Sequence, residues 1–165
     1  MQIPFRKPGE FTNIVPDPHL TQKKFNEFKD KLAKLKSVLP SAIKELQRLA
    51  EMGDFSENAA YQMAKGRVRS INDKIFDLGE HLKSAIIIKP GKNKQQVQLG
   101  SQVTKFLAGK ETTYQILGSS EIDLAKNIIS HNSPLGAALM GKKAGDSFTF
   151  SLGNKEITGK IIKVE

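Results

Sequence analysis

The sequence predicts an α+β protein, in which an antiparallel coiled-coil hairpin is followed by a small domain of strands and one short helix. Apolar residues in the first half recur at alternating spacings of three and four, which keeps one stripe of a helix facing a partner helix. This pattern occurs twice, and the two copies mirror each other about Phe55, so the chain is expected to fold back there. After residue 90 the pattern changes to the short alternation that is typical of strands. We therefore predict four segments: an extended, proline-rich arm (1–20), the hairpin (21–89), a linker (90–96) and the second domain (97–165).

The arm over residues 1–20 contains four prolines, which deny it the hydrogen bonds of a helix or a central strand. The first helix is expected to begin after Thr21, a plausible N-cap, and to continue to Met52. Pro40 lies inside it, but the apolar stripe continues past this residue in phase, which favours a kink over a break. The stripe consists of Phe25, Phe28, Leu32, Leu35, Leu39, Ala42, Leu46 and Leu49.

The fold-back is expected at Gly53, a residue type that readily adopts the left-handed conformation that ends a helix. Asp54 lies three residues before Glu57, which is the spacing of a capping box opening the second helix. That helix is expected to continue to about Ile88, with glycines at positions 66 and 79 that weaken it. Its mirrored stripe consists of Tyr61, Ala64, Val68, Ile71, Ile75, Leu78, Leu82 and Ala85. Two arms of about 30 residues would be roughly 45 Å long, so the tip would lie far from the second domain.

The second domain is predicted to contain four strands and one helix. Ser133 followed by Pro134 has the pattern of an N-cap and a first-turn proline, and the helix that they open should stop at Gly141. The aromatic residues Phe106, Tyr114, Phe148 and Phe150 suffice for a small core. Strands are expected over 96–107, 112–117, 148–152 and 155–164, with turns at 109–110 and 153–154.

The composition limits the class of protein. There are 26 basic and 17 acidic residues, a net charge of +9, which favours nucleic acid or an acidic protein surface as partner, although such an excess is also common on solvated surfaces. The absence of cysteine excludes disulfides and thiolate metal sites. Because the sequence contains no long apolar run and no signal-peptide core, we expect a cytoplasmic protein without membrane contact.

The tip carries two groups that could do chemistry. If Asp54 and Glu57 are both helical, their carboxylates emerge on one side and could help to hold a magnesium ion. The pair alone would bind magnesium poorly, so a useful site would need a second party. The alternative is that the two carboxylates only cap the helix and stabilise its dipole.

A basic and amide-bearing face follows the tip. Asn58, Gln62, Lys65, Arg69 and Asn72 follow one helical stripe, Arg67 lies beside it, and no acidic residue occurs between Asn58 and Asn72. Such a face suits the guidance of a phosphate backbone toward a bound cation. A solvated helix surface is the alternative.

The tip and the second domain together resemble a known family. The run Gly53-Asp54-Phe55-Ser56-Glu57-Asn58-Ala59-Ala60-Tyr61 resembles the tip signature of the Gre family of bacterial transcript cleavage factors. The continuation with Tyr61, Gln62, Lys65, Arg67, Arg69 and Ile71 is more similar to the GreB branch than to GreA. Residues 128–136 and 145–146 are similar to the family's second domain, so the likeness covers about residues 21–164.

The resemblance implies a function in partnership with RNA polymerase. A second domain with a fold similar to FKBP prolyl isomerases would dock on the rim of the polymerase's secondary channel through Ser133, Pro134 and Leu135, and the coiled coil would enter the channel. At the active centre, Asp54 and Glu57 would help to hold magnesium and its water, so that a backtracked polymerase cleaves its own nascent RNA, releases a 3′ fragment and resumes elongation. The protein would be a monomer, would not be an enzyme by itself and would have no cofactor of its own. Contacts to RNA or the channel are expected from Phe55, Ser56, Asn58, Tyr61, Gln62, Lys65, Arg67 and Arg69.

Three other readings stay open at this point. The chain could be a channel-binding regulator or inhibitor without cleavage activity, a prolyl isomerase carried on a helical arm, or a basic coiled coil that binds nucleic acid. The histidines His19, His81 and His131 are scattered without metal-ligand spacing, which favours surface or local hydrogen-bonding roles. Ser130, His131 and Asp123 are not expected to form a catalytic triad, because the serine and histidine are adjacent in the chain.

Overall fold

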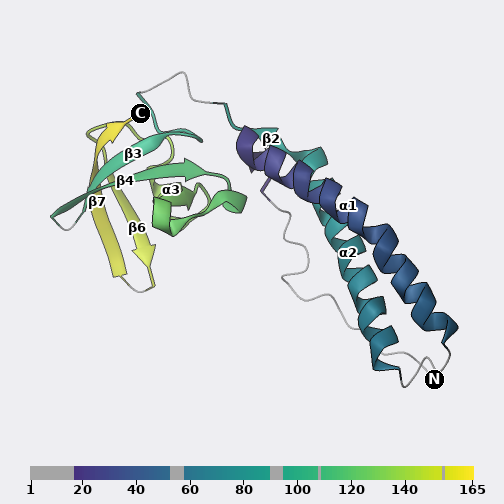
Figure 1. Cartoon of the computed structure of the whole chain (residues 1–165). Helices are drawn as coiled ribbons and strands as arrows, with labels where there is room; N and C mark the ends of the chain where they lie inside the picture. Colours follow the sequence, from purple (N-terminus) through teal and green to yellow (C-terminus); the bar gives the residue numbers. More distant parts are fainter. Residues whose placement is uncertain (1–16, 53–57, 90–94, 108, 154) are drawn as a thin grey trace, which may run out of the picture.

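The protein consists of a long two-helix hairpin and a second domain built on a five-stranded sheet (Figure 1). A computed structural model describes residues 17–52, 58–89, 95–107, 109–153 and 155–165. The predicted α+β class, with an N-terminal helical hairpin before a strand-rich domain, is confirmed. The first 16 residues of the predicted arm, the fold-back at 53–57, most of the predicted linker and Asn154 of the predicted turn lie outside the described residues.

Helix α1 (Gln22–Glu51) and helix α2 (Ala59–Ser84) form the hairpin. The Thr21 hydroxyl accepts a hydrogen bond from the Lys24 backbone N–H at 3.2 Å, which confirms the predicted N-cap of α1. Helix α1 passes through Pro40 without interruption, so the prediction that this proline does not break the helix is confirmed.

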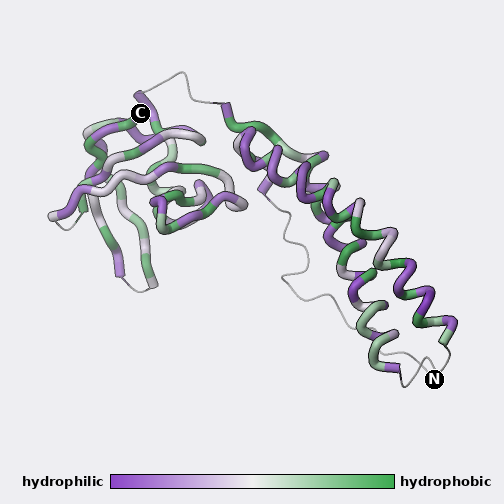
Figure 2. The backbone as a smooth tube through the Cα atoms, in the orientation of Figure 1, coloured by the Kyte–Doolittle hydropathy of each residue, from purple (hydrophilic) through white to green (hydrophobic). Residues whose placement is uncertain are grey.

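The seam between the helices follows the predicted stripes. Every stripe residue is buried or half-buried, whereas most of the residues between them are exposed. Figure 2 shows hydrophobic residues recurring along both helices between hydrophilic ones. The most buried positions are Ala42, Leu49, Ala64 and Ile71, and small side chains at two of them allow the helices to approach closely. Packing of this shared apolar stripe, rather than helix propensity alone, stabilises the hairpin.

The base of the hairpin differs from the prediction. Helix α2 ends at Ser84, not near Ile88, and strand β2 (Ile86–Ile87) pairs in parallel with strand β1 (His19–Leu20). Three consecutive isoleucines, at 86–88, favour an extended chain because β-branched side chains fit a pleated strand. His19 and Leu20, the last two residues of the predicted extended arm, therefore form a strand that pairs with β2. The Ile86 N–H donates to the Pro18 carbonyl, an acceptor that proline retains although it lacks the N–H donor.

The second domain has the sheet order β5-β4-β3-β7-β6, antiparallel except for the parallel pair β4 and β5. Helix α3 (Pro134–Leu139) begins at the predicted cap Ser133 and packs against β6 and β5. Strand β5 and two 3₁₀ turns were not predicted. The other elements are β3 (Gln102–Leu107), β4 (Lys110–Leu117), η1 (Ser119–Glu121), η2 (Leu124–Lys126), β5 (Ile128–Ser130), β6 (Ser147–Leu152) and β7 (Lys155–Val164).

The core of the second domain lies between the sheet and α3. Phe148 is buried and Tyr114 and Phe150 pack against the core, but Phe106 is 44% exposed, so its predicted place in the core is wrong. The first strand of the sheet begins at Gln102 rather than at 96, because Gly100, at φ 94°, turns the chain. The buried cluster consists of Val97, Val103, Ile116, Ile129, Leu139, Phe148, Ile161 and Val164.

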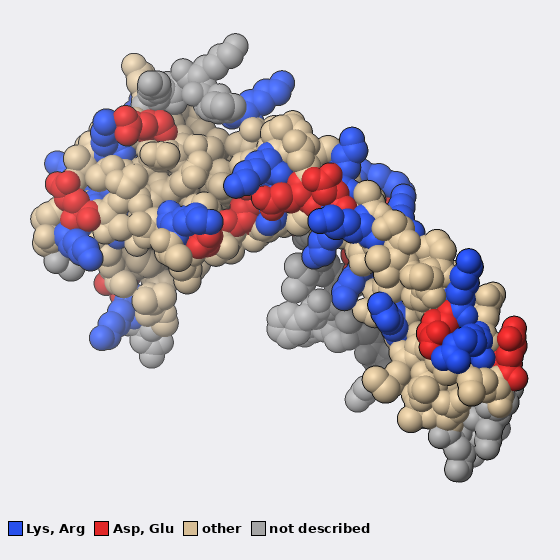
Figure 3. Space-filling view, viewed as in Figure 1, with Lys and Arg blue, Asp and Glu red and all other residues tan. Residues whose placement is uncertain are grey.

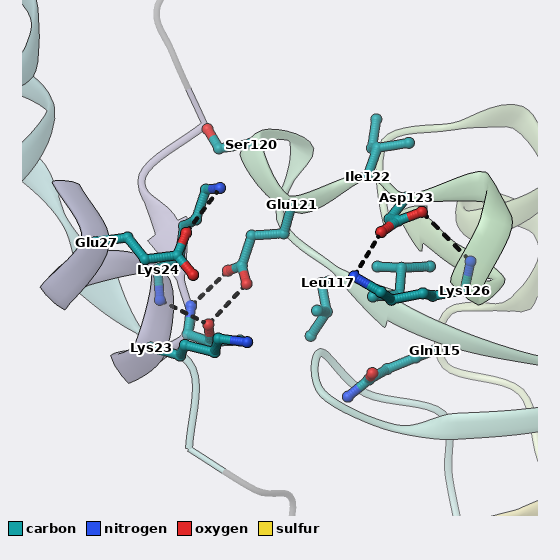
Figure 4. A pocket seen from close by; sticks show the side chains of 12 residues that line it. Lys23, Lys24, Glu27, Gln115, Leu117, Ser120, Glu121, Ile122, Asp123 and Lys126 are labelled. Atoms are coloured by element: carbon teal, nitrogen blue, oxygen red, sulfur yellow. Dashed lines mark hydrogen bonds and ion pairs between the residues drawn. The ribbon is translucent and has the colours of Figure 1, made fainter. Parts of the chain in front are cut away.

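The junction of the hairpin and the second domain is polar. Glu121 of the second domain accepts hydrogen bonds from the Thr21 backbone N–H at 2.6 Å and from the Thr21 hydroxyl at 2.7 Å (Figure 4). Asp17 accepts a hydrogen bond from the Ser119 backbone N–H at 2.7 Å. Figure 3 shows acidic and basic side chains side by side at this junction. They border a cleft of about 500 Å³ lined by Thr21, Lys23, Lys24, Glu27, Gln115, Leu117, Ser120, Glu121, Ile122, Asp123, Lys126 and Ile128.

The junction should weaken in acid through Asp17. Burial alone would raise the pKa of this carboxyl, but hydrogen bonds from Ser119 and His19 outweigh it and lower the pKa from 3.8 to about 2. Because the pKa of Asp17 is lower in the folded than in the unfolded state, its ionised carboxylate stabilises the fold at pH values above the unfolded pKa. This contribution is lost as the pH falls from about 4 to about 2. We expect wild-type protein to lose about 2 kcal/mol more unfolding free energy between pH 5 and pH 2 than Asp17→Asn does, measured by urea denaturation. Equal losses in the two proteins would contradict this.

Glycine within α2 offers a second stability prediction. A Cβ added at Gly66 would meet nothing within 4 Å, so glycine is not required there by packing. Gly66→Ala should therefore raise the unfolding free energy by about 1 kcal/mol, because glycine costs more backbone entropy in a helix than alanine. Urea denaturation measures this effect, and Gly79→Ala provides a second site with equally open surroundings. If neither variant raises the unfolding free energy, the backbone entropy of these two glycines does not limit the stability of α2.

In the part of the chain that the structure describes, no helix combines the length and the apolar character that a membrane span requires.

Candidate functional site

The ends of the two helices define a site far from the second domain. The C-terminal end of α1 and the N-terminal end of α2 lie together at the end of the hairpin away from the sheet (Figure 1). Helix α1 has 30 residues and α2 has 26, so the two helices are roughly 45 Å and 39 Å long. The predicted site residues Asp54, Phe55, Ser56 and Glu57 connect these two ends in sequence and lie outside the described residues.

The N-cap of α2 is Asn58. Its side-chain oxygen accepts a hydrogen bond from the Tyr61 backbone N–H at 3.1 Å, and the helix begins at Ala59. The prediction that Asp54 opens this helix through a capping box with Glu57 is therefore wrong. Asparagine is as good an N-cap as aspartate, and it lies immediately before the first helical residue. The capping role is thus filled by a neutral residue that follows both carboxylates in the chain.

The predicted basic face lies on the surface of α2. Gln62, Lys65, Arg67 and Arg69 are all exposed, whereas Tyr61 is half-buried, as its place on the seam requires. Arg69 forms a 4.0 Å ion pair with Asp73, and both side chains are largely exposed, so the contact stabilises little and leaves the guanidinium accessible. The described beginning of α2 therefore presents amide and cationic groups to solvent.

A shallow apolar groove lies between the helices near the same end. It has a volume of about 380 Å³, and the exposed side chain of Met63 lines it together with Arg67. Met63 is 77% exposed and was not singled out from the sequence. The heptad pattern assigns Met63 to the surface but gives no signal that it borders a groove.

The three predicted docking residues have different surroundings. The Ser133 hydroxyl makes two hydrogen bonds within the domain, because it accepts from the Gly136 N–H at 3.0 Å and donates to the Ser130 carbonyl at 2.6 Å. Leu135 packs against the core, and Pro134 is exposed. Of the three, Pro134 is therefore the one whose ring is available for contact with another molecule.

The histidines lie close together in space although they are far apart in the sequence, and each makes a local hydrogen-bond contact, which confirms the predicted role. His19 and His131 both contact Asp17, and the His81 ring nitrogen Nε2 lies 3.0 Å from the Asp17 carbonyl oxygen. Their positions are far apart in the sequence, so no spacing pattern could reveal this cluster. It forms only because β1 brings the arm against the second domain.

Comparison with known proteins identifies the family. Residues 19–87 match the family model described as "Transcription elongation factor, N-terminal", and residues 92–165 match "Transcription elongation factor, GreA/GreB, C-term". Transcription elongation factor GreA of Staphylococcus saprophyticus is 35% identical over 150 residues, covering 88% of this chain and 95% of that protein. GreA of Orientia tsutsugamushi strain Boryong is 40% identical over 131 residues, covering 77% and 82%. Among solved structures, GreA factor homolog 1 of Thermus thermophilus has 24% identity and a TM-score of 0.42, covering 90% of this chain and 99% of that chain.

The two family models and the GreA relatives agree, and the chain belongs to the GreA/GreB family of transcription elongation factors. The closer likeness of its tip to GreB, and the likeness of its second domain to FKBP proteins, stay predictions.

Proposed function

We propose that this protein enters the secondary channel of RNA polymerase with its hairpin and stimulates the polymerase to cleave nascent RNA in backtracked complexes. The observation that carries the proposal is the position of the carboxylate pair in the chain. Asp54 and Glu57 fall between the two helix ends that lie farthest from the second domain. A hairpin that is roughly 45 Å long can bring such groups into another protein's interior while its base stays outside.

The capping of α2 supports a chemical role for the pair. Since Asn58 is the N-cap of α2 and satisfies the Tyr61 N–H, the cap of this helix does not occupy the carboxylate of Asp54. Two carboxylates provide the oxygen ligands that magnesium prefers, but magnesium keeps several waters and is usually shared with substrate phosphates. We propose that the pair completes a magnesium site together with groups of the polymerase and has no cofactor of its own. The ion would supply an activated water and charge stabilisation for hydrolysis.

The surface of α2 supports a contact with RNA. The exposed Lys65, Arg67 and Arg69 follow the tip in the chain, and cationic groups attract a phosphate backbone without reading its sequence. Gln62 and Asn58 add amide groups to the same end of α2, and Tyr61 adds a half-buried aromatic ring. We propose that this face guides the RNA 3′ end toward the carboxylates, with Phe55 and Ser56 at the tip making further contacts.

The second domain would hold the protein at the channel rim, with exposed Pro134 as one contact and the chain acting as a monomer. The prolyl isomerase alternative is not favoured, because Phe148 is buried and Tyr114 and Phe150 pack on the core rather than lining an open pocket. Retention of both carboxylates also disfavours a channel-binding regulator without cleavage activity.

The test is RNA cleavage in backtracked complexes of purified polymerase with magnesium. We expect the full chain to accelerate shortening of the RNA at its 3′ end by at least about tenfold, which corresponds to about 1.4 kcal/mol of barrier. Free RNA without polymerase should remain intact, because the proposed site is incomplete in this protein alone. Unchanged cleavage rates at saturating protein would refute the proposal, and tighter binding to free nucleic acid than to polymerase would favour the nucleic-acid-binding reading.

A further inference from the structure

Asp17, His19 and His131 form a cluster at the junction of the hairpin and the second domain. Each offers a ligand atom, and these atoms all lie within 4.8 Å of one another. The His19 Nδ1 lies 2.9 Å from Asp17 Oδ1, and the His131 Nδ1 lies 3.5 Å from Asp17 Oδ2. The two rings meet edge to face, with centroids 5.4 Å apart. The hairpin side thus contributes two of the groups and the second domain the third.

The carboxylate of Asp17 is oriented by the backbone. Its Oδ2 accepts from the Ser119 N–H at 2.7 Å, and its Oδ1 accepts from the His19 N–H at 3.1 Å. An ionised carboxylate has about four lone-pair sites, two on each oxygen, so one on each oxygen remains after these bonds. The remaining sites meet the imidazoles of His19 and His131. The Asp17 side chain is 5% exposed, so water competes little for it.

The ligand types and their spacing suit a small tetrahedral ion. Zinc binds histidine nitrogen and carboxylate oxygen at about 2.0–2.2 Å, which separates neighbouring ligand atoms in a tetrahedron by roughly 3.3 Å. The His19 and His131 Nδ1 atoms lie 2.9 and 3.5 Å from different oxygens of the Asp17 carboxylate, and the three ligand atoms lie within 4.8 Å of one another, so a small shift of side chains brings them to this spacing. A neutral imidazole that carries its proton on Nε2 leaves Nδ1 free to ligate. Two imidazoles and one carboxylate favour a transition-metal ion over magnesium or calcium, which prefer oxygen ligands.

We propose that Asp17, His19 and His131 bind a divalent transition-metal ion of the zinc class, with water as the fourth ligand. The ion replaces the hydrogen bond between His19 Nδ1 and the carboxylate, and it replaces the contact of His131 Nδ1 with the Leu117 carbonyl oxygen at 3.4 Å, with coordinate bonds. It therefore links β1, at the base of the hairpin, to the segment between β5 and α3. Bound metal fixes the direction in which the hairpin leaves the second domain. This site is separate from the tip carboxylates and does not depend on the proposed function.

The test is calorimetric titration of the full chain with zinc, followed by the visible spectrum of the cobalt-substituted protein. We expect one zinc ion per chain and the intense cobalt absorption that is typical of four-coordinate sites. His19→Gln and His131→Gln should each weaken zinc binding by more than about 100-fold, since loss even of an outer partner costs about 10–100-fold. Millimolar magnesium should not compete.

Two matched variants separate this site from other zinc ligands. His81→Gln removes a histidine that meets Asp17 through the backbone carbonyl and not through the carboxylate, so zinc binding should be retained. Asp54→Asn with Glu57→Gln removes the tip carboxylates and should also leave zinc binding unchanged. No saturable zinc binding, or equal weakening by His81→Gln and His131→Gln, would leave the cluster as a hydrogen-bonded junction only and overturn the proposal. If His131→Gln does not fold, His19→Gln decides, because the His19 side chain is 31% exposed and its loss opens no core.

Discussion

Replacing Asp54 with asparagine and Glu57 with glutamine is expected to reduce stimulated RNA cleavage about 100-fold, with polymerase binding preserved. The substitutions keep the size of the side chains and remove the two charges that would help to hold magnesium. Metal-ion catalysis contributes several kcal/mol of transition-state stabilisation, and each 1.4 kcal/mol is about tenfold in rate. The measurement is the rate of RNA shortening in backtracked complexes at saturating variant, with affinity for polymerase determined separately.

A matched control is Asp73→Asn with Asp77→Asn. This variant removes two negative charges from exposed positions on the same helix, away from the tip, and should retain stimulation within about twofold, because exposed charges of this kind interact weakly. Raising the magnesium concentration should partly restore cleavage to the tip variant if the lost carboxylates lowered affinity for the ion. Full stimulation by the tip variant would mean that the protein acts on polymerase without donating ligands, as a channel-binding regulator could.

The seam of the hairpin could be predicted residue by residue because its determinants are local. A helix repeats every 3.6 residues, so the spacing of apolar side chains defines the seam, and Leu49 and Ala64 are buried as their stripe requires. The N-cap of α1 at Thr21 could also be predicted, because a hydroxyl just before a helical pattern can accept a hydrogen bond from an N–H in the first turn, here that of Lys24. At the second helix the same logic assigned the cap to Asp54 and missed Asn58, because several cap-forming residues follow one another there and spacing does not rank them.

The junction could not be predicted because its partners are distant in the sequence. His19 lies at the start of the hairpin and His131 in the second domain, and they meet only after β1 pairs with β2. The prolines were expected to exclude a helix or a central strand, and β1 agrees with this because it lies in a two-stranded sheet, in which Pro18 contributes through its carbonyl. The predicted role of the tip came from its residue types and from the resemblance of residues 53–61 to the Gre family, whereas the contacts that orient the hairpin had to come from the structure.

Gly118 is the position where a single methyl group should have the largest effect on this geometry. A Cβ at Gly118 would overlap the backbone carbonyl oxygen of His19, and it would come within 3.4 Å of the Asp17 carboxylate. Because the overlapping atom belongs to the backbone, no side-chain rotation relieves it and β1 must move. We expect Gly118→Ala to destabilise the packing of β1 against the second domain by about 3 kcal/mol, since overpacking typically costs about 1–3 kcal/mol and this contact is at the severe end.

The effect should be confined to the junction and visible by hydrogen exchange. The Ile86 and Ile88 N–H groups donate to the Pro18 and Leu20 carbonyls, so they exchange with solvent only when β1 moves away. Since each 1.4 kcal/mol corresponds to about a factor of ten, a loss of about 3 kcal/mol should accelerate their exchange by about 100-fold. The Gly100 N–H donates to Ile116 within the second domain and should exchange as in the wild type. Gly66→Ala is the same chemical change at an open site and should accelerate none of them.

Stimulated cleavage should fall in Gly118→Ala although the tip is intact, because a hairpin free to change direction enters the channel less often. Unchanged exchange at Ile86 and Ile88 would mean that β1 is not held by the contacts described here.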